Sequence, residues 1–376
     1  MLTDRAFIKT PYIITSPTWK DEFKKFLDIL PESLARTCLS LEDELVEVVL
    51  DMGRPALIRT AAATQAVESI VVTEQELDEV ISHLSPFNGD NRAGITGTLH
   101  RISALRNRDD KIIGLTLRVG RALYGTSTPL HDLLGKKRSM LLLGPPGVGK
   151  TTILREAARY LADEHHLRVM IIDTSNEIAG DGDIPHIGIG QARRLQVPNG
   201  KDQARVMIEA VENHMPQVIV VDEIGTEAES EAARTIAERG VQILATAHGG
   251  NLANLLKNPT LNTLLGGIQS VTLSDEEAFR RGTNKTVLER IFPPTFDVLV
   301  ECKDRETFII HKPLSEVVDN TLQGDPPIPE VRKLNPDGTY STFRDTTPSQ
   351  IYPFGISLVP KPEPVPQKFQ KKRSHL

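Results

Sequence analysis

Eight consecutive residues, Gly144 to Thr151, place a glycine-rich loop, a lysine and a hydroxyl at the spacing that grips a nucleoside triphosphate. The glycines allow successive backbone N–H groups to turn inward around a β-phosphate. Lys150 supplies a cation to the β- and γ-phosphate oxygens, and Thr151 offers a hydroxyl to Mg²⁺. The residues that we expect to bind nucleotide are Gly144, Pro145, Pro146, Gly147, Val148, Gly149, Lys150, Thr151 and Thr152.

The segments on either side of this loop have the pattern that a phosphate-binding loop requires. An apolar run at 139–143 precedes it, as expected for a buried parallel strand. Residues 152–165 then carry apolar side chains at helical spacing, so the loop opens a helix whose N-terminal dipole faces the phosphates. Strand, loop and helix together predict a P-loop.

A second nucleotide signature follows the apolar run 218–221, which ends in two acids. Asp222 is expected to hold the Mg²⁺ shell, and Glu223 to polarise an attacking water. Another apolar segment, 168–173, lies between the two motifs. An additional strand and a paired glutamate distinguish RecA-like ATPases from simple kinases. We therefore expect an α/β fold with a RecA-like P-loop core and a parallel sheet.

Two more polar side chains follow strand-like segments. Glu177 comes after 168–173, and His248 comes after 241–247. Ligands of open α/β sheets bind at the carboxyl ends of the strands. Glu177 is therefore a second candidate for positioning water or metal, and His248, like Thr246, a candidate for sensing the γ-phosphate. The alternative for Glu177 is an acid that stabilises a helix N-terminus, and the alternative for His248 is a purely structural histidine.

The identity of the base and the source of a further cation are the remaining questions about the site. The single Asn-Lys pair, Asn284-Lys285, is followed by Thr and Val, not by the continuation of a guanine-reading motif, which favours ATP. ATPases of this kind often take an arginine from a neighbouring subunit. The sequence offers five candidates without choosing among them: Arg193, Arg194, Arg280, Arg281 and Arg290.

Composition sets the broad class of the protein. The chain has 376 residues, a formal net charge of -6 and 39% apolar residues, which allows two or three globular domains and gives no overall attraction to nucleic acid. Two cysteines are too few for a disulfide framework or a multi-cysteine zinc site. With no apolar segment of membrane-spanning length and no signal-like amino terminus, we expect a soluble intracellular protein.

Three domains are expected along the chain. Residues 1–125 mix strand-like and helical patterns, with a hairpin turn at 107–110, and predict a small α+β domain. Residues 126–312 alternate strands and helices and predict the ATPase domain, with 270–273 as one of its strands. Because 11 of the 25 prolines lie in the last 64 residues, we expect 313–376 to be an extended, partly disordered tail.

A basic segment lies within the expected amino-terminal domain. Seven positive residues stand against Asp109 and Asp110, a local charge of +5 in an acidic protein. This charge could bind single-stranded nucleic acid, but no interleaved aromatic residues accompany it, so a solvated sheet face or a subunit interface is favoured. The seven are Arg92, Arg101, Arg106, Arg108, Lys111, Arg118 and Arg121.

The order of these motifs resembles the stage III sporulation protein AA family, its cyanobacterial and plastid-encoded relatives, and, more distantly, type II and type IV secretion ATPases. The resemblance implies an ATP-hydrolysing core behind a smaller domain, a hexameric ring, and a plastid stromal or bacterial cytoplasmic location. A carboxyl-terminal nucleic-acid domain that such relatives often carry is not evident, since the only histidine of the tail is His375. The resemblance rests on segments 97–101, 114–121, 144–151, 173–180, 221–223, 245–249, 288–290 and 293–297.

The expected function is Mg²⁺-dependent ATP hydrolysis coupled to conformational work on a protein or nucleic-acid partner. Two alternatives remain open. One is an ATP-binding switch or scaffold with little turnover, and the other is a single-stranded nucleic-acid-binding ATPase. The motifs describe how phosphate is handled and do not identify what the energy moves.

Overall fold

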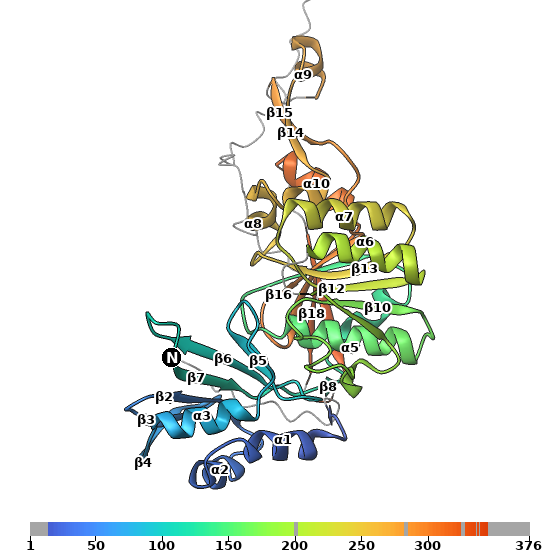
Figure 1. Cartoon of the computed structure of the whole chain (residues 1–376). Coiled ribbons are helices and arrows are strands. Elements are labelled where there is room, and N and C mark those ends of the chain that lie inside the picture. Colours follow the sequence, from blue (N-terminus) through green and yellow to red (C-terminus); the bar gives the residue numbers. More distant parts are fainter. Residues whose placement is uncertain are drawn as a thin grey trace, which may run out of the picture.

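The computed structural model describes residues 14–198, 202–281, 285–324, 328–335, 337 and 339–344. A smaller sheet with its helices lies beside a larger sheet flanked by helices, and a thin arm projects from the larger part (Figure 1). None of the helices within these ranges is long and apolar enough to cross a bilayer.

The amino-terminal part is an antiparallel six-stranded sheet with the order β4-β3-β2-β7-β6-β5. Alternate apolar residues of the strands, such as Val48, Ile102 and Leu117, are buried against Phe26 and Leu77 of the helices. The predicted hairpin turn joins β6 and β7, while residues 97–100 form a loop before β6. The elements are β1 (Ile14–Thr15), α1 (Trp19–Asp28), α2 (Glu32–Leu39), β2 (Leu45–Asp51), β3 (Pro55–Thr60), β4 (Thr64–Val71), α3 (Glu74–Ser82), β5 (Arg92–Gly94), β6 (Arg101–Arg106), β7 (Ile112–Arg118) and β8 (Leu123–Tyr124).

The larger sheet has nine strands in the order β11-β10-β12-β13-β9-β16-β17-β18-β19. The first six are parallel and the last three join antiparallel. The strands are β9 (Met140–Leu143), β10 (Val169–Asp173), β11 (Arg193–Gln196), β12 (Val218–Ile224), β13 (Gln242–Ala247), β16 (Val298–Cys302), β17 (Thr307–His311), β18 (Glu330–Leu334) and β19 (Tyr340–Arg344).

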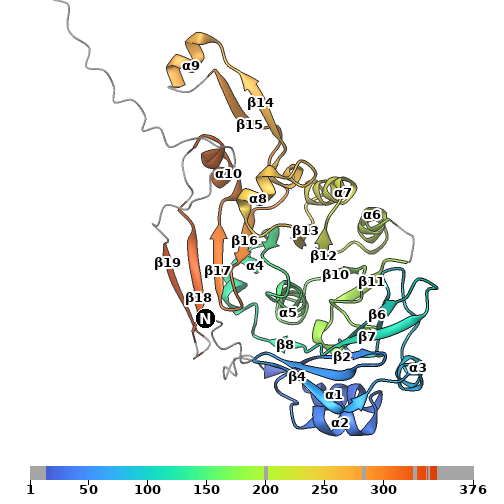
Figure 2. The same cartoon turned by 90° about the vertical axis from the view of Figure 1, so that its left-hand side faces the viewer.

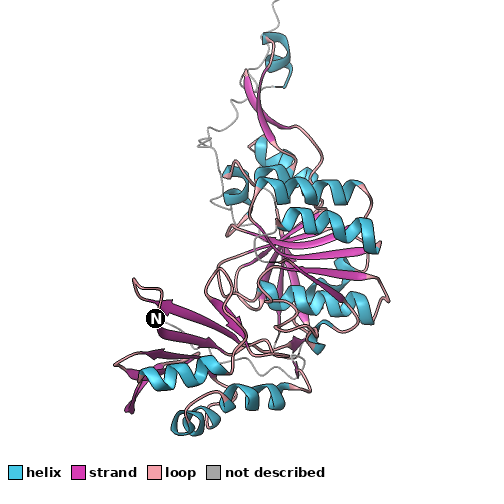
Figure 3. Ribbon diagram, viewed as in Figure 1, coloured by secondary structure: helices cyan, strands magenta, loops and turns pink. Residues whose placement is uncertain are grey.

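Helices cover both faces of this sheet, as expected for an α/β core built on a parallel sheet (Figure 3). α6 and α7 pack on one face in one apolar core, and α5 packs on the other face in a second core. The strand before the P-loop, β9, and the strand that carries the two acids, β12, are separated by β13. The helices are η1 (Thr128–Leu130), α4 (His131–Leu134), α5 (Lys150–Asp163), η2 (Ile187–Ile189), α6 (Gln203–His214), α7 (Glu227–Glu238), α8 (Leu252–Lys257) and η3 (Asn262–Leu265).

One predicted strand of the parallel sheet lies elsewhere. Residues 270–273 fall in and after β14 (Ile268–Thr272), which pairs antiparallel with β15 (Thr286–Arg290). With α9 (Asp275–Arg281) these strands form the arm that projects from the body in Figures 1 and 2. A short apolar run does not distinguish a strand of a sheet core from one of a separate ribbon.

The expected extended tail is wrong for residues 314–322, 330–334 and 340–344. They form α10 (Leu314–Leu322), β18 and β19, so the larger sheet continues past the expected domain boundary at 312. The prolines bound these elements without interrupting them, since Pro313 is the N-cap of α10 and Pro329 directly precedes β18. Residues 345–376 lie outside the described residues.

Arg332 anchors this carboxyl-terminal segment. Its guanidinium, 3% exposed, binds Asp132 of α4 through both oxygens at 2.5 and 3.0 Å, and also donates to the Pro129 carbonyl. Truncating one partner of a buried pair leaves the other polar groups unpaired, so Arg332→Ala should lower the thermal unfolding midpoint by roughly 5 °C or more. Lys333→Ala, an exposed change on the same strand, should shift it by less than about 2 °C. Equal shifts in differential scanning calorimetry would contradict this anchoring.

Candidate active site

The P-loop backbone has the shape of a phosphate cradle. Gly149, with φ 105°, caps the start of α5, and Gly147 has φ 75°. Gly144, with φ 149°, also needs to lack a side chain, because a Cβ there would lie 2.5 Å from the Cys302 carbonyl oxygen. The loop therefore sits directly between β9 and the end of β16, where its N–H groups can turn toward one ligand.

Lys150 lies over this loop. Its Nζ donates to the Gly144 carbonyl at 2.7 Å and to the Pro145 carbonyl at 3.2 Å. These are weak acceptors for an ammonium group compared with phosphate oxygens. The lysine is thus positioned at the cradle and can exchange its partners for an anion.

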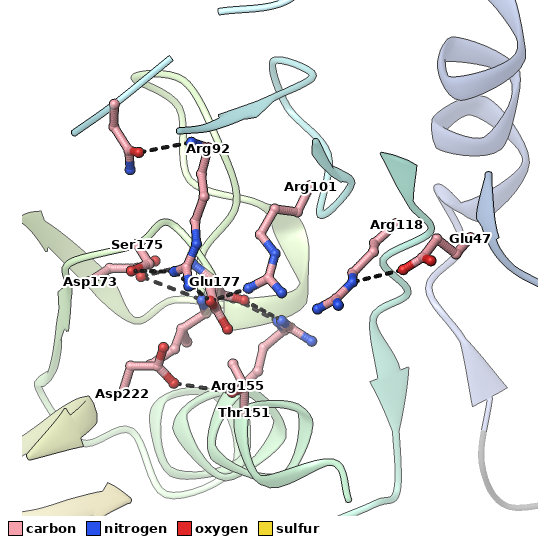
Figure 4. Close-up of polar contacts among 12 residues, drawn as sticks. Glu47, Arg92, Arg101, Arg118, Thr151, Arg155, Asp173, Ser175, Glu177 and Asp222 are labelled. Atoms are coloured by element: carbon pink, nitrogen blue, oxygen red, sulfur yellow. Dashed lines mark hydrogen bonds and ion pairs between the residues drawn. The ribbon is translucent and has the colours of Figure 1, made fainter. Parts of the chain in front are cut away.

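Thr151 and Asp222 meet beside the cradle (Figure 4). The Thr151 hydroxyl donates to Asp222 Oδ1 at 3.1 Å. Burial, followed by the charges of Glu177 and Asp173, raises the pKa of the Asp222 carboxyl to about 7. A carboxylate beside a hydroxyl supplies hard oxygen donors of the kind that Mg²⁺ prefers, and a bound cation would offset the repulsion that raises the pKa of Asp222. The residues therefore fit Mg²⁺.

The raised pKa of Asp222 leads to a prediction about how the stability of the folded protein depends on pH. The folded protein holds the Asp222 proton up to about pH 7, whereas the unfolded chain releases it near pH 4, so stability falls as the pH rises through this window. Without Mg²⁺, Asp222→Asn should raise the thermal unfolding midpoint at pH 8 by about 3 °C or more, and by less at pH 5. An equal change in the thermal unfolding midpoint at pH 8 and pH 5 would contradict the raised pKa of Asp222.

Glu177 lies in a turn that follows β10, so the alternative of a helix N-terminus does not apply. The Asp173 carboxylate accepts from the backbone N–H groups of Glu177 at 3.0 Å and Ala179 at 2.8 Å, and thereby fixes the turn. The Glu177 carboxylate accepts from Arg92, at 3.3 Å, and from Arg101. Both arginines come from the amino-terminal sheet, on β5 and β6 (Figure 4).

Glu223 and His248 form a separate pair at the ends of β12 and β13. His248 Nδ1 lies 3.2 Å from Glu223 Oε1, and both side chains are exposed. Gln203 of α6, which belongs to no recognisable sequence motif, donates to the Glu223 carbonyl at 2.8 Å. Thr246 donates to the Asp222 carbonyl and so ties the two strand ends together.

A cavity of about 520 Å³ lies between the P-loop and the amino-terminal sheet. Among the described residues that line it, seven are cationic and three are acidic. This excess of four positive charges complements a triphosphate. Glu177 lines the cavity, whereas Asp222, Glu223 and His248 are not among its described lining residues. The cations are Arg92, Arg101, Arg118, Arg121, Lys150, Arg155 and Arg305, and the acids are Glu177, Asp181 and Glu306.

The arginines proposed as the extra cation were expected to act on a neighbouring subunit, and four of the five lie away from this chain's own cavity. Arg280 pairs with Glu277, and Arg290 pairs with Asp319. Arg194 donates to the carbonyls of residues 180 and 182, and Arg193 is exposed on β11. The side chain of Arg281 lies outside the described residues.

The basic segment of the amino-terminal sheet does not form one free surface. Besides Arg92 and Arg101, Arg118 pairs with Glu47 at 3.0 Å, and Lys111 pairs with Glu74. Arg121 is buried over the Trp19 ring. The signal that could have pointed to Arg92 and Arg101 as cavity-lining residues was the excess of positive charge in a segment next to the P-loop domain.

Comparisons with known proteins show the family to which the chain belongs. Residues 20–273 match the family described as "Sporulation stage III, protein AA". The chain is 53% identical to "Uncharacterized protein ycf45" of Porphyra purpurea over 85% of its length and 57% of that protein. It is 52% identical to "Protein SEEDLING PLASTID DEVELOPMENT 1" of Arabidopsis thaliana over 83% of its length and 46% of that protein. The chain thus spans about half the length of these two relatives.

More distant proteins match as well. The identity is 27% with "Stage III sporulation protein AA" of Bacillus subtilis, over 63% of this chain and 85% of that protein. Among solved structures, the pilus retraction motor PilT with bound ADP matches with a TM-score of 0.51 and 16% identity, over 78% of this chain and 88% of that chain. At this identity the likeness concerns the fold, a RecA-like P-loop core. The chain belongs to the sporulation stage III protein AA family.

Proposed function

We propose that this protein is a Mg²⁺-dependent ATPase whose amino-terminal sheet closes over the nucleotide. The observation that carries the proposal is the cationic cavity, which has the P-loop on one side and two arginines of the amino-terminal sheet on the other. A triphosphate held by the cradle would place its γ-phosphate toward these arginines. ATP is favoured over GTP because the chain lacks a guanine-reading motif.

The residues at the P-loop and around the cavity have distinct tasks in this proposal. Lys150 binds the β- and γ-phosphate oxygens, and Thr151 and Asp222 hold the Mg²⁺ ion, which when bound neutralises charge on the phosphates. Arg101 and Arg92 stabilise the charge that develops on the γ-phosphoryl group. One carboxylate orients the attacking water, and the candidates are Glu223 and Glu177.

The position of Arg92 and Arg101 supports coupling of hydrolysis to movement. Both now bind Glu177, and a γ-phosphate would compete for them. Nucleotide binding and release would then shift the amino-terminal sheet relative to the P-loop, since the two arginines belong to that sheet. We propose that this motion performs work on a protein or nucleic-acid partner.

The proposal extends to the oligomeric state and the cellular location of the protein, which we infer from the similar proteins. A homo-oligomeric ring, with a hexamer as the expected form, fits the fold shared with the pilus motor. The plastid-related name of the Arabidopsis protein supports the plastid stroma, and the Bacillus relative supports a bacterial cytoplasm.

A steady-state phosphate-release assay tests the enzyme class. The wild type should release phosphate from ATP in the presence of Mg²⁺, and substitution of the water-orienting carboxylate should lower kcat by about 10²-fold or more. Glu223→Gln and Glu177→Gln, measured side by side, identify that carboxylate. Saturable ATP binding without turnover in the wild type would instead favour the ATP-binding switch.

A further inference from the structure

Arg155 is a buried cation that neither nucleotide signature includes. It lies on α5, four residues after Thr151, so the two side chains share one face of the helix directly behind the P-loop. Its exposure is 6%. A charge at such a site is costly unless the surrounding groups satisfy it, so its presence requires an explanation.

The Arg155 guanidinium donates its hydrogen bonds to backbone carbonyl groups rather than to a carboxylate of the described residues. Nε donates to the Ile178 carbonyl at 2.6 Å, Nη2 to the Glu177 carbonyl at 2.5 Å, and Nη1 to the Arg121 carbonyl at 3.5 Å. None of the ion pairs among the described residues includes Arg155. Burial lowers its pKa, and the charges of Asp173 and Asp222 oppose that shift. Its positive charge is therefore balanced by the acids of the site at longer range.

These bonds hold the turn that carries Glu177 from one side, while Asp173 holds it from the other. Asp173 accepts from the N–H groups of the turn, and Arg155 donates to its carbonyls. The peptide groups at Glu177 and Ile178 are thus fixed between an anion and a cation (Figure 4). Because the guanidinium is a rigid planar fork bonded to two carbonyls of the turn, a movement of α5 would pull on this turn.

The third bond extends the connection to the amino-terminal sheet. Arg121 follows β7, where the chain leaves that sheet. The loop between β10 and β11 also contacts the amino-terminal part of the protein. Gly97 N donates to the Asp181 carbonyl at 3.1 Å, and His186 Nε2 lies 2.8 Å from Glu22 of α1. Arg155 thus connects the P-loop helix α5 both to the turn that carries Glu177 and to the segment at Arg121 that follows β7.

We infer that Arg155 is a positioning residue that couples occupation of the P-loop to the Glu177 turn and to the amino-terminal sheet. The inference rests on the proposed function, because it assigns the consequence of nucleotide binding at that site. A displacement of about 1 Å in a reacting group costs on the order of 10²-fold in rate. Loss of Arg155 should therefore impair turnover much more than binding.

The first test separates binding from turnover. Arg155→Met keeps the length of the side chain and removes its donors, and it should lower kcat at least roughly 30-fold while the affinity for a fluorescent ADP analogue with Mg²⁺ changes by less than about threefold. Arg155→Lys, which keeps the charge, should recover part of kcat. For Arg155→Ala, millimolar guanidinium should restore turnover, as the ion can replace the missing group. Arg159→Met, one turn later and paired with Glu156, is the matched control and should turn over normally.

The second test measures the coupling itself by amide hydrogen exchange with and without ADP and Mg²⁺. In the wild type, nucleotide should slow exchange in the P-loop, at 174–179 and at 119–123, whereas in Arg155→Met only the P-loop should respond. If Arg155→Met does not fold, Arg155→Lys carries the comparison. Unchanged kcat, or an undiminished response at 174–179, would overturn the inference. An absence of any response in the wild-type P-loop would refute the proposed function instead.

Discussion

Replacing Lys150 with Ala should abolish ATP turnover, lowering kcat/KM by at least about 10³-fold. The ammonium group lies within 3.2 Å of two loop carbonyls, at the cradle where the β- and γ-phosphates are expected. In the proposed mechanism, its loss would remove the cation that neutralises both phosphates before and during transfer. Phosphate release measured over a range of ATP concentrations would report both kcat and KM.

Lys136→Ala is the matched control for this experiment. Lys136 is exposed near the end of α4, so the same change in charge there should leave turnover within about twofold of the wild type. Hydrolysis that survives in Lys150→Ala would mean that phosphate is released at another site or by a contaminant.

Arg101→Ala should have the second largest effect, a loss of roughly 10²- to 10³-fold in kcat with a smaller change in KM. Arg101 contacts Glu177 and lines the cavity opposite the P-loop. A cation that meets the γ-phosphoryl group contributes most when charge develops in the transition state, which affects kcat more than binding. A pre-steady-state measurement would show whether the chemical step is the one that slows.

Arg108→Ala serves as its control, because Arg108 is an exposed arginine in the β6–β7 turn of the same sheet. Equal effects of the two substitutions would contradict the role of Arg101 in the cavity. A large rise in KM at constant kcat would assign Arg101 to ground-state binding of nucleotide.

The local features of the site could be predicted from the sequence. The glycine spacing of the P-loop requires backbone conformations that the structure shows at Gly147 and Gly149, and the strand before Asp222 is evident from its unbroken apolar run. These features are determined by residues close together in the sequence, so the spacing of residue types was sufficient to predict them. The RecA-like core follows from them.

The contacts between distant segments could not be predicted in this way. Arg92 and Arg101 meet Glu177 across 85 and 76 positions of the chain, and no local pattern specifies that pairing. The carboxyl-terminal strands β18 and β19 contain no proline, but the prolines around them pointed to an extended tail. Composition does not reveal that Arg332 binds Asp132. Arg155 carried no signal, since an arginine at that point of an amphipathic helix is typical of a surface position.

One pocket of this chain is proposed to bind a magnesium nucleotide. Titration of the folded protein with a fluorescent ADP analogue and Mg²⁺ tests it most directly, with Lys150→Ala and an excess of EDTA as controls. We expect saturable binding of one nucleotide per chain that both controls weaken at least about tenfold. Well-folded wild-type protein that shows no saturable binding would contradict the account.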